Sequence, residues 1–302
     1  MNLKPPPSGN SPIADPNHEL PAIAGGTPVR SRHNRIIFGA PLIGEAEAAS
    51  VADCIRSRWI GLGERVSRFE QEFAAYKQAP HAAAVSSCSA GLHLALDALG
   101  IGAGDEVIAP SLTFCSTIHS ILHVGARPVL VDSDRQSLNV DPAAIGQAIT
   151  PRTKAVIAVH MAGRACEMDA ILAIANRHGL QVIEDCAHAI ETTYRGVSAG
   201  LLGDAGCFSF YPTKSITTGD GGMVISRHRD LIARVKLMSY NGVAASAWSR
   251  FTGDTAGYEV MAAGYKYNMT DMEAALALPQ LPLLDERWSR RQALWNAYDG
   301  QL

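Results

Sequence analysis

Residues 81–110 read HAAAVSSCSAGLHLALDALGIGAGDEVIAP, and this stretch decides the fold. An apolar run (HAAAVS) is followed by apolar residues at helical spacing (SAGLHLALDALG) and then by a second apolar run (DEVIAP). Runs that are apolar throughout are typical of strands buried on both faces, and such strands joined by helices pair in parallel. The stretch therefore predicts one strand–helix–strand unit of an α/β fold.

The same alternation continues along the chain. Further short apolar runs are RPVLVD (127–132), AVIAVH (155–160), QVIED (181–185), GCFSF (206–210) and GGMVIS (221–226). Helical spacing fills most of the segments between them and also predicts helices at 44–58, 65–77, 231–245 and 270–278, the last with Thr270 as N-cap. We therefore expect a mostly parallel sheet sandwiched by helices over residues 37–235.

Outside this domain the sequence changes character. Residues 1–36 are rich in Pro and Gly and lack a continuous apolar run, which is typical of a disordered leader. Residues 236–302 predict the start of a small C-terminal domain that ends early, so we expect a truncated second domain.

Composition excludes several function classes. The net charge of −3 gives the whole chain no attraction to nucleic acid or anionic membranes, and no apolar run approaches the roughly 20 residues that span a bilayer. The six cysteines occur singly, without zinc spacing and too sparsely for a disulfide scaffold, which favours a reduced, cytoplasmic setting.

In open parallel sheets, ligands bind beyond the carboxyl ends of the strands, so the residues directly after each strand are the candidates. Ser87, Cys88 and Ser89 follow the first strand and open a helix, where free N–H groups suit a phosphate, although plain N-capping by serine is the more frequent case. Phe114 follows the second strand, and it is either part of the core or a ring presented at the mouth of the sheet.

Two later strand ends carry charge. Asp185 ends a buried strand and needs a partner there, which is either a helix N-terminus or a protonated ligand nitrogen; His188 follows three residues later. Lys214 follows the strand that contains Ser209, and burial of such a lysine lowers its pKa and frees the amine for chemistry. A solvated surface lysine is the ordinary alternative.

Together these residues give one sheet edge a phosphate cradle, an aromatic plate, a carboxylate and a lysine. Pyridoxal 5'-phosphate needs all four. Other motifs do not indicate a different function. GIGAGDE (100–106) precedes its strand, which argues against a dinucleotide site, and GDGG (219–222) has no Walker lysine. Neither G-x-S-x-G nor H-E-x-x-H occurs, so nothing indicates a hydrolase. We therefore expect no metal in the site.

Four stretches carry a resemblance to a known family: residues 84–114, VIEDCAHAI (182–190), GDAGCFSFYPTKSITTGDGGM (203–223) and GYKYNMTDMEAALALPQL (264–281). From residue 37 to 287 the sequence resembles the DegT/DnrJ/EryC1/StrS sugar aminotransferases, which are fold-type I pyridoxal-phosphate enzymes. The resemblance implies a role for each candidate. Lys214 would carry the cofactor as a Schiff base, Asp185 would pair with the pyridinium nitrogen, His188 would lie near the ring hydroxyl, and Phe114 would stack on the ring.

The resemblance also implies how the cofactor phosphate is held. Its ligands would be the backbone at Cys88, Ser89 and Ala90 and the Ser209 hydroxyl, joined by Asn268 from the second subunit of a homodimer. Lys266 fills a slot that is often Asn in relatives.

The implied reaction moves an amino group from glutamate to a keto group of a nucleotide-linked sugar, with Lys214 as the proton carrier. Relatives with His in place of this lysine perform dehydration, so lysine favours transamination. Two alternatives stay open: another fold-type I enzyme that acts on amino or keto acids, and a truncated remnant that binds cofactor without turnover.

Overall fold

The computed structural model describes residues 31–34, 37, 39–244, 252–253 and 259–301. The chain divides into two compact units, residues 1–40 and 41–302. Most of the leader predicted at 1–36 lies outside the described residues; the described part of the first unit holds one 3-10 turn, η2 (Arg32–Asn34).

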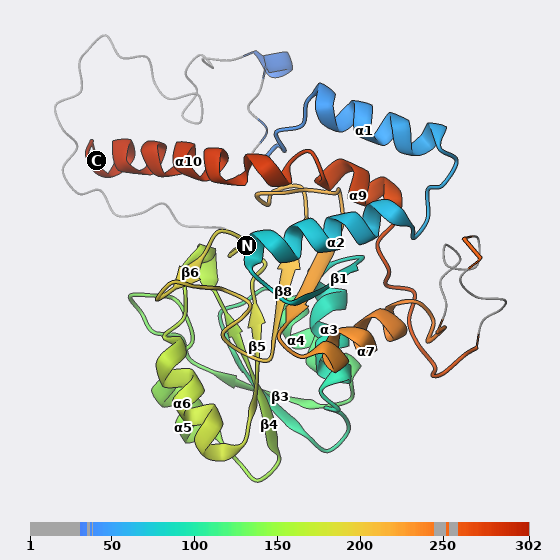
Figure 1. Cartoon of the computed structure of the whole chain (residues 1–302). Helices are drawn as coiled ribbons and strands as arrows, with labels where there is room; N and C mark the ends of the chain where they lie inside the picture. The colour runs from blue at the N-terminus through green and yellow to red at the C-terminus, as the bar shows by residue number, and fades with distance from the viewer. Residues whose placement is uncertain (1–30, 35–36, 38, 245–251, 254–258, 302) are drawn as a thin grey trace. The chain divides into compact units, whose positions relative to one another are not determined.

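The second unit is built on a seven-stranded sheet with the order β1-β9-β8-β5-β4-β2-β3 (Figure 1). In chain order the strands are β1 (His81–Val85), β2 (Glu106–Pro110), β3 (Arg127–Val131), β4 (Thr153–Val159), β5 (Gln181–Asp185), β8 (Ala205–Ser209) and β9 (Gly222–Ser226). Strands β3, β2, β4, β5 and β8 run parallel, while β9 is antiparallel to both β8 and β1. A separate hairpin joins β6 (Thr193–Tyr194) and β7 (Val197–Ser198). This confirms the predicted mostly parallel α/β sheet.

Helices cover both faces of the sheet. The helices of the described residues are α1 (Glu45–Arg56), α2 (Glu64–Lys77), α3 (Cys88–Ala98), α4 (Cys115–His123), α5 (Pro142–Ala148), α6 (Met168–His178), α7 (Arg229–Ser239), α9 (Asp271–Ala277) and α10 (Leu284–Asp299), with 3-10 turns η3 (Met161–Gly163) and η4 (Leu281–Leu283). The helix predicted at 231–245 ends earlier, because Asn241 and Gly242 take left-handed backbone angles; residue 245 itself lies outside the described range.

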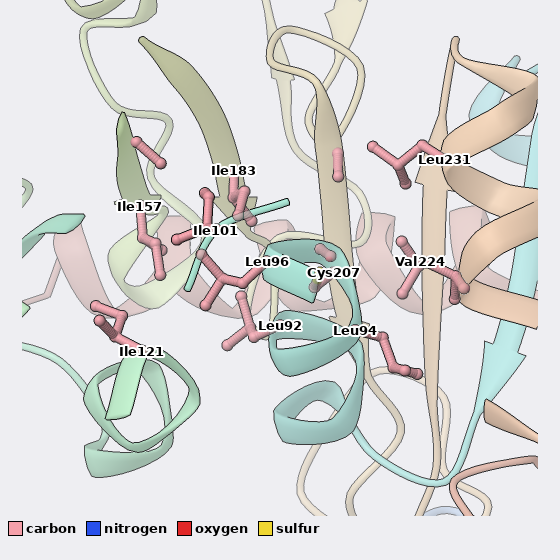
Figure 2. Packing of buried hydrophobic residues seen from close by; sticks show 14 of the residues in the cluster. Leu92, Leu94, Leu96, Ile101, Ile121, Ile157, Ile183, Cys207, Val224 and Leu231 are labelled. Atoms are coloured by element: carbon pink, nitrogen blue, oxygen red, sulfur yellow. The ribbon is translucent and has the colours of Figure 1, made fainter. Parts of the chain in front are cut away.

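The alternation of side chains along each strand separates the core into two sides. On one side α3, α4 and α7 pack on the sheet, with Leu92 and Leu96 of α3 facing Ile157, Ile183 and other strand residues (Figure 2). On the other side α2 and α9 cover β1, β8 and β9, while α5 and α6 cover β2 and β4. Both faces are buried, which is why the strands are apolar throughout.

Beyond β9 the chain adds α7, α9, η4 and α10. Thr270 caps α9 as predicted: its hydroxyl accepts from Glu273 N–H, and the Glu273 carboxylate accepts from Thr270 N–H. In α10 only Leu284 is buried. That residues 236–302 begin a second domain stays a prediction. No helix in the described part of the chain is long and apolar enough to cross a membrane.

Candidate active site

A cavity of about 560 Å³ lies at the carboxyl ends of β4, β5 and β8, where the sheet rule predicts a ligand site. It brings together residues that are far apart in the sequence. Its lining includes the predicted site residues Ser87, Cys88, Ser89, Phe114, Asp185, His188, Ser209 and Lys214. Ala90 and Asn268 do not line it.

Asp185 is an almost fully buried carboxylate at the end of β5. It is 5% exposed, and its oxygens accept from Thr117 Oγ1 (2.9 Å) and Ala187 N–H (3.1 Å); Cys88 Sγ lies 3.8 Å from Oδ1, but its single proton has a nearer acceptor in Cys207 O (3.4 Å). Among the described residues no cation lies within ion-pair distance of it. A buried carboxylate that faces a cavity in this way suits a protonated ring nitrogen.

Lys214 lies in the loop between β8 and β9, which is held from outside at two points. The Gln280 side chain accepts from Thr217 N–H (3.1 Å) and donates to Thr217 C=O (2.8 Å). Arg291 of α10 donates to Ser215 Oγ (2.9 Å). The loop that carries the lysine is therefore fixed by side chains from the C-terminal segment.

The environment of Lys214 favours the neutral amine. Burial lowers its pKa, and the nearby Cys88 and Asp185 only partly oppose this. Burial also lowers the pKa of His188, and the charge of Lys214 adds to that effect. Both residues thus present neutral nitrogen to the cavity over more of the pH range than ordinary side chains do.

The α3 N-terminus supplies free donors. The N–H groups of Cys88 and Ser89 have no acceptor within the described part of the chain, as expected at the start of a helix. Ser87 is the N-cap and accepts from Ala90 N–H (3.0 Å), so the plain capping role is present and Ala90 has already used its donor. Of the three predicted N–H donors, those of Cys88 and Ser89 are therefore left without an acceptor among the described residues.

Strand β9 backs this turn without spare room. A Cβ at Gly222 would lie 2.5 Å from the Ser87 carbonyl carbon and 2.7 Å from Cys88 N. Ser209 also lines the cavity; its Oγ accepts from Tyr211 N–H (3.3 Å), and its own proton has no acceptor among the described residues. The donors suit a phosphate.

Phe114 and Asn268 differ in their position relative to the cavity: Phe114 lines it and Asn268 does not. Phe114 is the N-cap of α4 and is 73% exposed, so its ring is presented at the cavity and is not part of the core. Asn268 forms a bridge with Val85, its Nδ2 donates to Met269 O, and its buried Oδ1 has no partner among the described residues. Asn268 does not reach its own chain's cavity.

Close to the cavity, His160, Glu184 and Cys186 lie near enough to hold a metal ion. Glu184 already accepts from His160 Nε2 (2.9 Å) and from three backbone N–H groups, and His160 Nδ1 accepts from Cys166 N–H. The carboxylate and the imidazole are thus satisfied by hydrogen bonds, and we assign the group a structural role.

Sequence reasoning missed two residues. Thr117 touches Asp185, and Gln280 touches the loop that carries Lys214. Gln280 is a polar residue among apolar ones in ALALPQL, a signal that it is buried with a partner. Thr117 gives a weaker signal, because threonines are common in helices without any such contact.

The sequence from residue 41 to 302 matches the model of the DegT/DnrJ/EryC1/StrS aminotransferase family. The chain belongs to this family. It is 47% identical over 271 residues to the spore coat polysaccharide biosynthesis protein SpsC of Bacillus subtilis (strain 168), covering 89% of this chain and 70% of SpsC.

Solved structures of aminotransferases have the same fold as this chain. The Spr1654 protein of Streptococcus pneumoniae, named for a proposed sugar aminotransferase activity, superposes with a TM-score of 0.83 at 31% identity over 88% of this chain and 72% of that one. A synthase of 3-amino-5-hydroxybenzoic acid superposes with a TM-score of 0.79 at 33% identity, covering 85% and 66% of the two chains. Spr1654 was solved in PLP and PMP forms. The predicted family, aminotransferase activity and pyridoxal phosphate cofactor are therefore confirmed.

Proposed function

We propose that this aminotransferase moves an amino group from glutamate to a keto group of a nucleotide-linked sugar, in the synthesis of a polysaccharide. The observation that carries the proposal is the convergence of Lys214 and Asp185 in one cavity with free phosphate donors beside them. The name of SpsC supports the pathway class.

Each cavity residue has a task in this proposal. Lys214 would hold the cofactor covalently, and its amine would carry a proton to and from the substrate carbon. Asp185 would pair with the ring nitrogen and favour its protonated form, and Phe114 would stack on the ring. The bound cofactor supplies an electron sink for the carbon that changes its substituent.

The remaining residues hold and orient. The Cys88 and Ser89 N–H groups and the Ser209 hydroxyl bind the phosphate, without the Ala90 N–H. His188 lies beside Lys214 at the cavity wall, where a neutral imidazole can bond the ring hydroxyl.

We also propose a cytoplasmic homodimer in which Asn268 serves the partner's site. Two observations support this: Asn268 does not line the candidate cavity and its buried Oδ1 has no partner among the described residues, and all six cysteines are free thiols. Dissociation of a dimer into monomers on dilution should then lower cofactor affinity.

A second candidate has an observation of its own. One structural relative is named for an amino-hydroxybenzoic acid, which is not a sugar. The alternative is transamination of a keto acid or another small keto compound.

Labelled glutamate separates the two candidates. The purified protein would be incubated with ¹⁵N-glutamate, pyridoxal phosphate and either nucleotide-linked keto-sugars or 2-keto acids, with Lys214→Ala as the control. Label in an amino sugar that is absent with the control supports the proposal. Label only in amino acid products contradicts the sugar substrate, and no label with any acceptor contradicts both candidates.

A further inference from the structure

Thr117 contacts two segments of the candidate active site, the start of α4 with Phe114 and the end of β5 with Asp185. It lies in the first turn of α4, fully buried, and its Oγ1 lies 2.9 Å from Asp185 Oδ2. The other two polar groups near this carboxylate, Ala187 N–H and Cys88 Sγ, both lie at Oδ1. Within the described residues, Thr117 is thus the only hydrogen-bond partner of Oδ2.

The direction of these hydrogen bonds follows from the chemistry of the groups. An ionised carboxylate only accepts, so the single hydroxyl proton of Thr117 goes to Asp185. Thr113 Oγ1 lies 2.7 Å from Thr117 Oγ1 and must therefore be the donor in that pair. A directed chain runs from Thr113, on the cavity wall, through Thr117 to Asp185.

Thr117 also holds the aromatic plate. Its backbone N–H donates to the Phe114 carbonyl (3.1 Å), in the turn that presents the exposed ring. One residue therefore ties the position of the plate to the position of the carboxylate, although the two lie on different elements.

This arrangement differs from the usual one for a buried helical hydroxyl, which bonds the backbone of its own helix. Ser120, one turn later on α4, does so by donating to Thr117 C=O (2.8 Å). The Thr117 proton leaves its helix and ends on the carboxylate of β5.

We propose that Thr117 is a positioning residue for the aminotransferase reaction, which orients the Asp185 carboxylate and sets its spacing from Phe114. This inference rests on the proposed role of Asp185 as the partner of the ring nitrogen. Thr117 itself acts through Asp185 and touches neither cofactor nor substrate.

The test compares four variants of the full chain. Thr117→Val removes the hydroxyl at nearly constant volume, Thr117→Ser restores it, Ser120→Ala removes a buried hydroxyl that does not reach Asp185, and Asp185→Asn removes the charge. Each is titrated with pyridoxal phosphate, and the conversion of the bound cofactor to its amine form by L-glutamate is followed by absorbance.

Thr117→Val should weaken cofactor binding or slow the conversion by about 10- to 100-fold, the range for a lost hydrogen bond to a charged group. Thr117→Ser and Ser120→Ala should stay within about threefold of the parent protein. The absorption maximum of bound cofactor should shift in Thr117→Val in the same direction as in Asp185→Asn. Thr117→Ala replaces the valine variant if that does not fold.

The outcomes distinguish a failure of the inference about Thr117 from a failure of the proposed role of Asp185. If Asp185→Asn loses binding and turnover while Thr117→Val matches the parent protein, the inference about Thr117 is overturned and the role of Asp185 stands. It is also overturned if Thr117→Ser behaves like Thr117→Val, or if Ser120→Ala loses as much as Thr117→Val. If Asp185→Asn itself matches the parent protein, the proposed function of the site fails.

Discussion

Replacing Gln280 by leucine should loosen the loop that carries Lys214. The Gln280 amide is buried and pairs with both the N–H and the C=O of Thr217, and its Nε2 also donates to Leu276 O (2.6 Å). Leucine has a similar size but no polar atoms. The buried Thr217 N–H and C=O would lose these partners.

The magnitude follows from those lost partners. Each buried polar group left unpaired costs about 1–3 kcal/mol, and the apolar replacement offsets part of this, so we expect a loss of about 2–4 kcal/mol in the free energy of unfolding. For a unit of this size that corresponds to a decrease of about 5–10 °C in Tm.

The assay is thermal unfolding of the cofactor-free protein, followed by circular dichroism. Gln147→Leu is the matched control, because Gln147 is exposed on α5 and the same substitution there should change Tm by about 1 °C or less. Well below the Tm, Gln280→Leu should also bind pyridoxal phosphate more slowly than the control, since Lys214 is held less firmly. A Tm for Gln280→Leu equal to that of Gln147→Leu would refute the reasoning.

The other predictions address the cradle, the plate and the lysine. Gly222→Ala pushes a Cβ against Ser87 and should cost about 1–3 kcal/mol in the free energy of unfolding and weaken cofactor binding. In the control Gly146→Ala the added Cβ meets nothing within 4 Å, so neither effect is expected. Equal losses of stability for the two variants in calorimetry would contradict the steric argument. Phe114→Ala should leave Tm unchanged, because the ring is exposed, while raising the cofactor Kd by about 5- to 10-fold; a fall in Tm with unchanged Kd would assign the ring to packing. Burial lowers the pKa of Lys214, so the rate of cofactor attachment should rise with pH and level off below 10.5, the ordinary lysine value; a plateau above 10.5 would show a solvated amine. Between the folded and unfolded pKa values the unfolded chain binds more protons, so the cofactor-free protein should also become more stable as pH rises through that interval, and Lys214→Met should reduce this gain.

Strand and helix positions were predictable because both sheet faces are buried. Each strand therefore reads as a short apolar run, and each covering helix shows its apolar face at regular spacing. Because every strand is apolar on both faces, the pattern of apolar residues does not indicate the direction of a strand. The run GGMVIS resembles its parallel neighbours, yet β9 is antiparallel to β8, which no pattern of apolar residues indicates.

The residues that face the cavity were predictable because they follow strands directly, and the sheet brings those ends together. Contacts between distant elements were not. Thr117 meets Asp185 across 68 residues, and Gln280 meets Thr217 across 63. Neither pair has local spacing that a sequence pattern could reveal. The local contact of Ala90 was also not predictable: its N–H donates to the Ser87 hydroxyl, and its role as a phosphate donor stays a prediction.

The central claim is that Lys214 carries the cofactor. The most direct measurement is reduction of the pyridoxal phosphate-loaded protein with borohydride, followed by proteolysis and mass spectrometry of the labelled peptide. We expect one phosphopyridoxyl group on Lys214 and none in Lys214→Ala. Label on another lysine, such as the buried Lys77, would contradict the account. Label that persists in Lys214→Ala would contradict it as well.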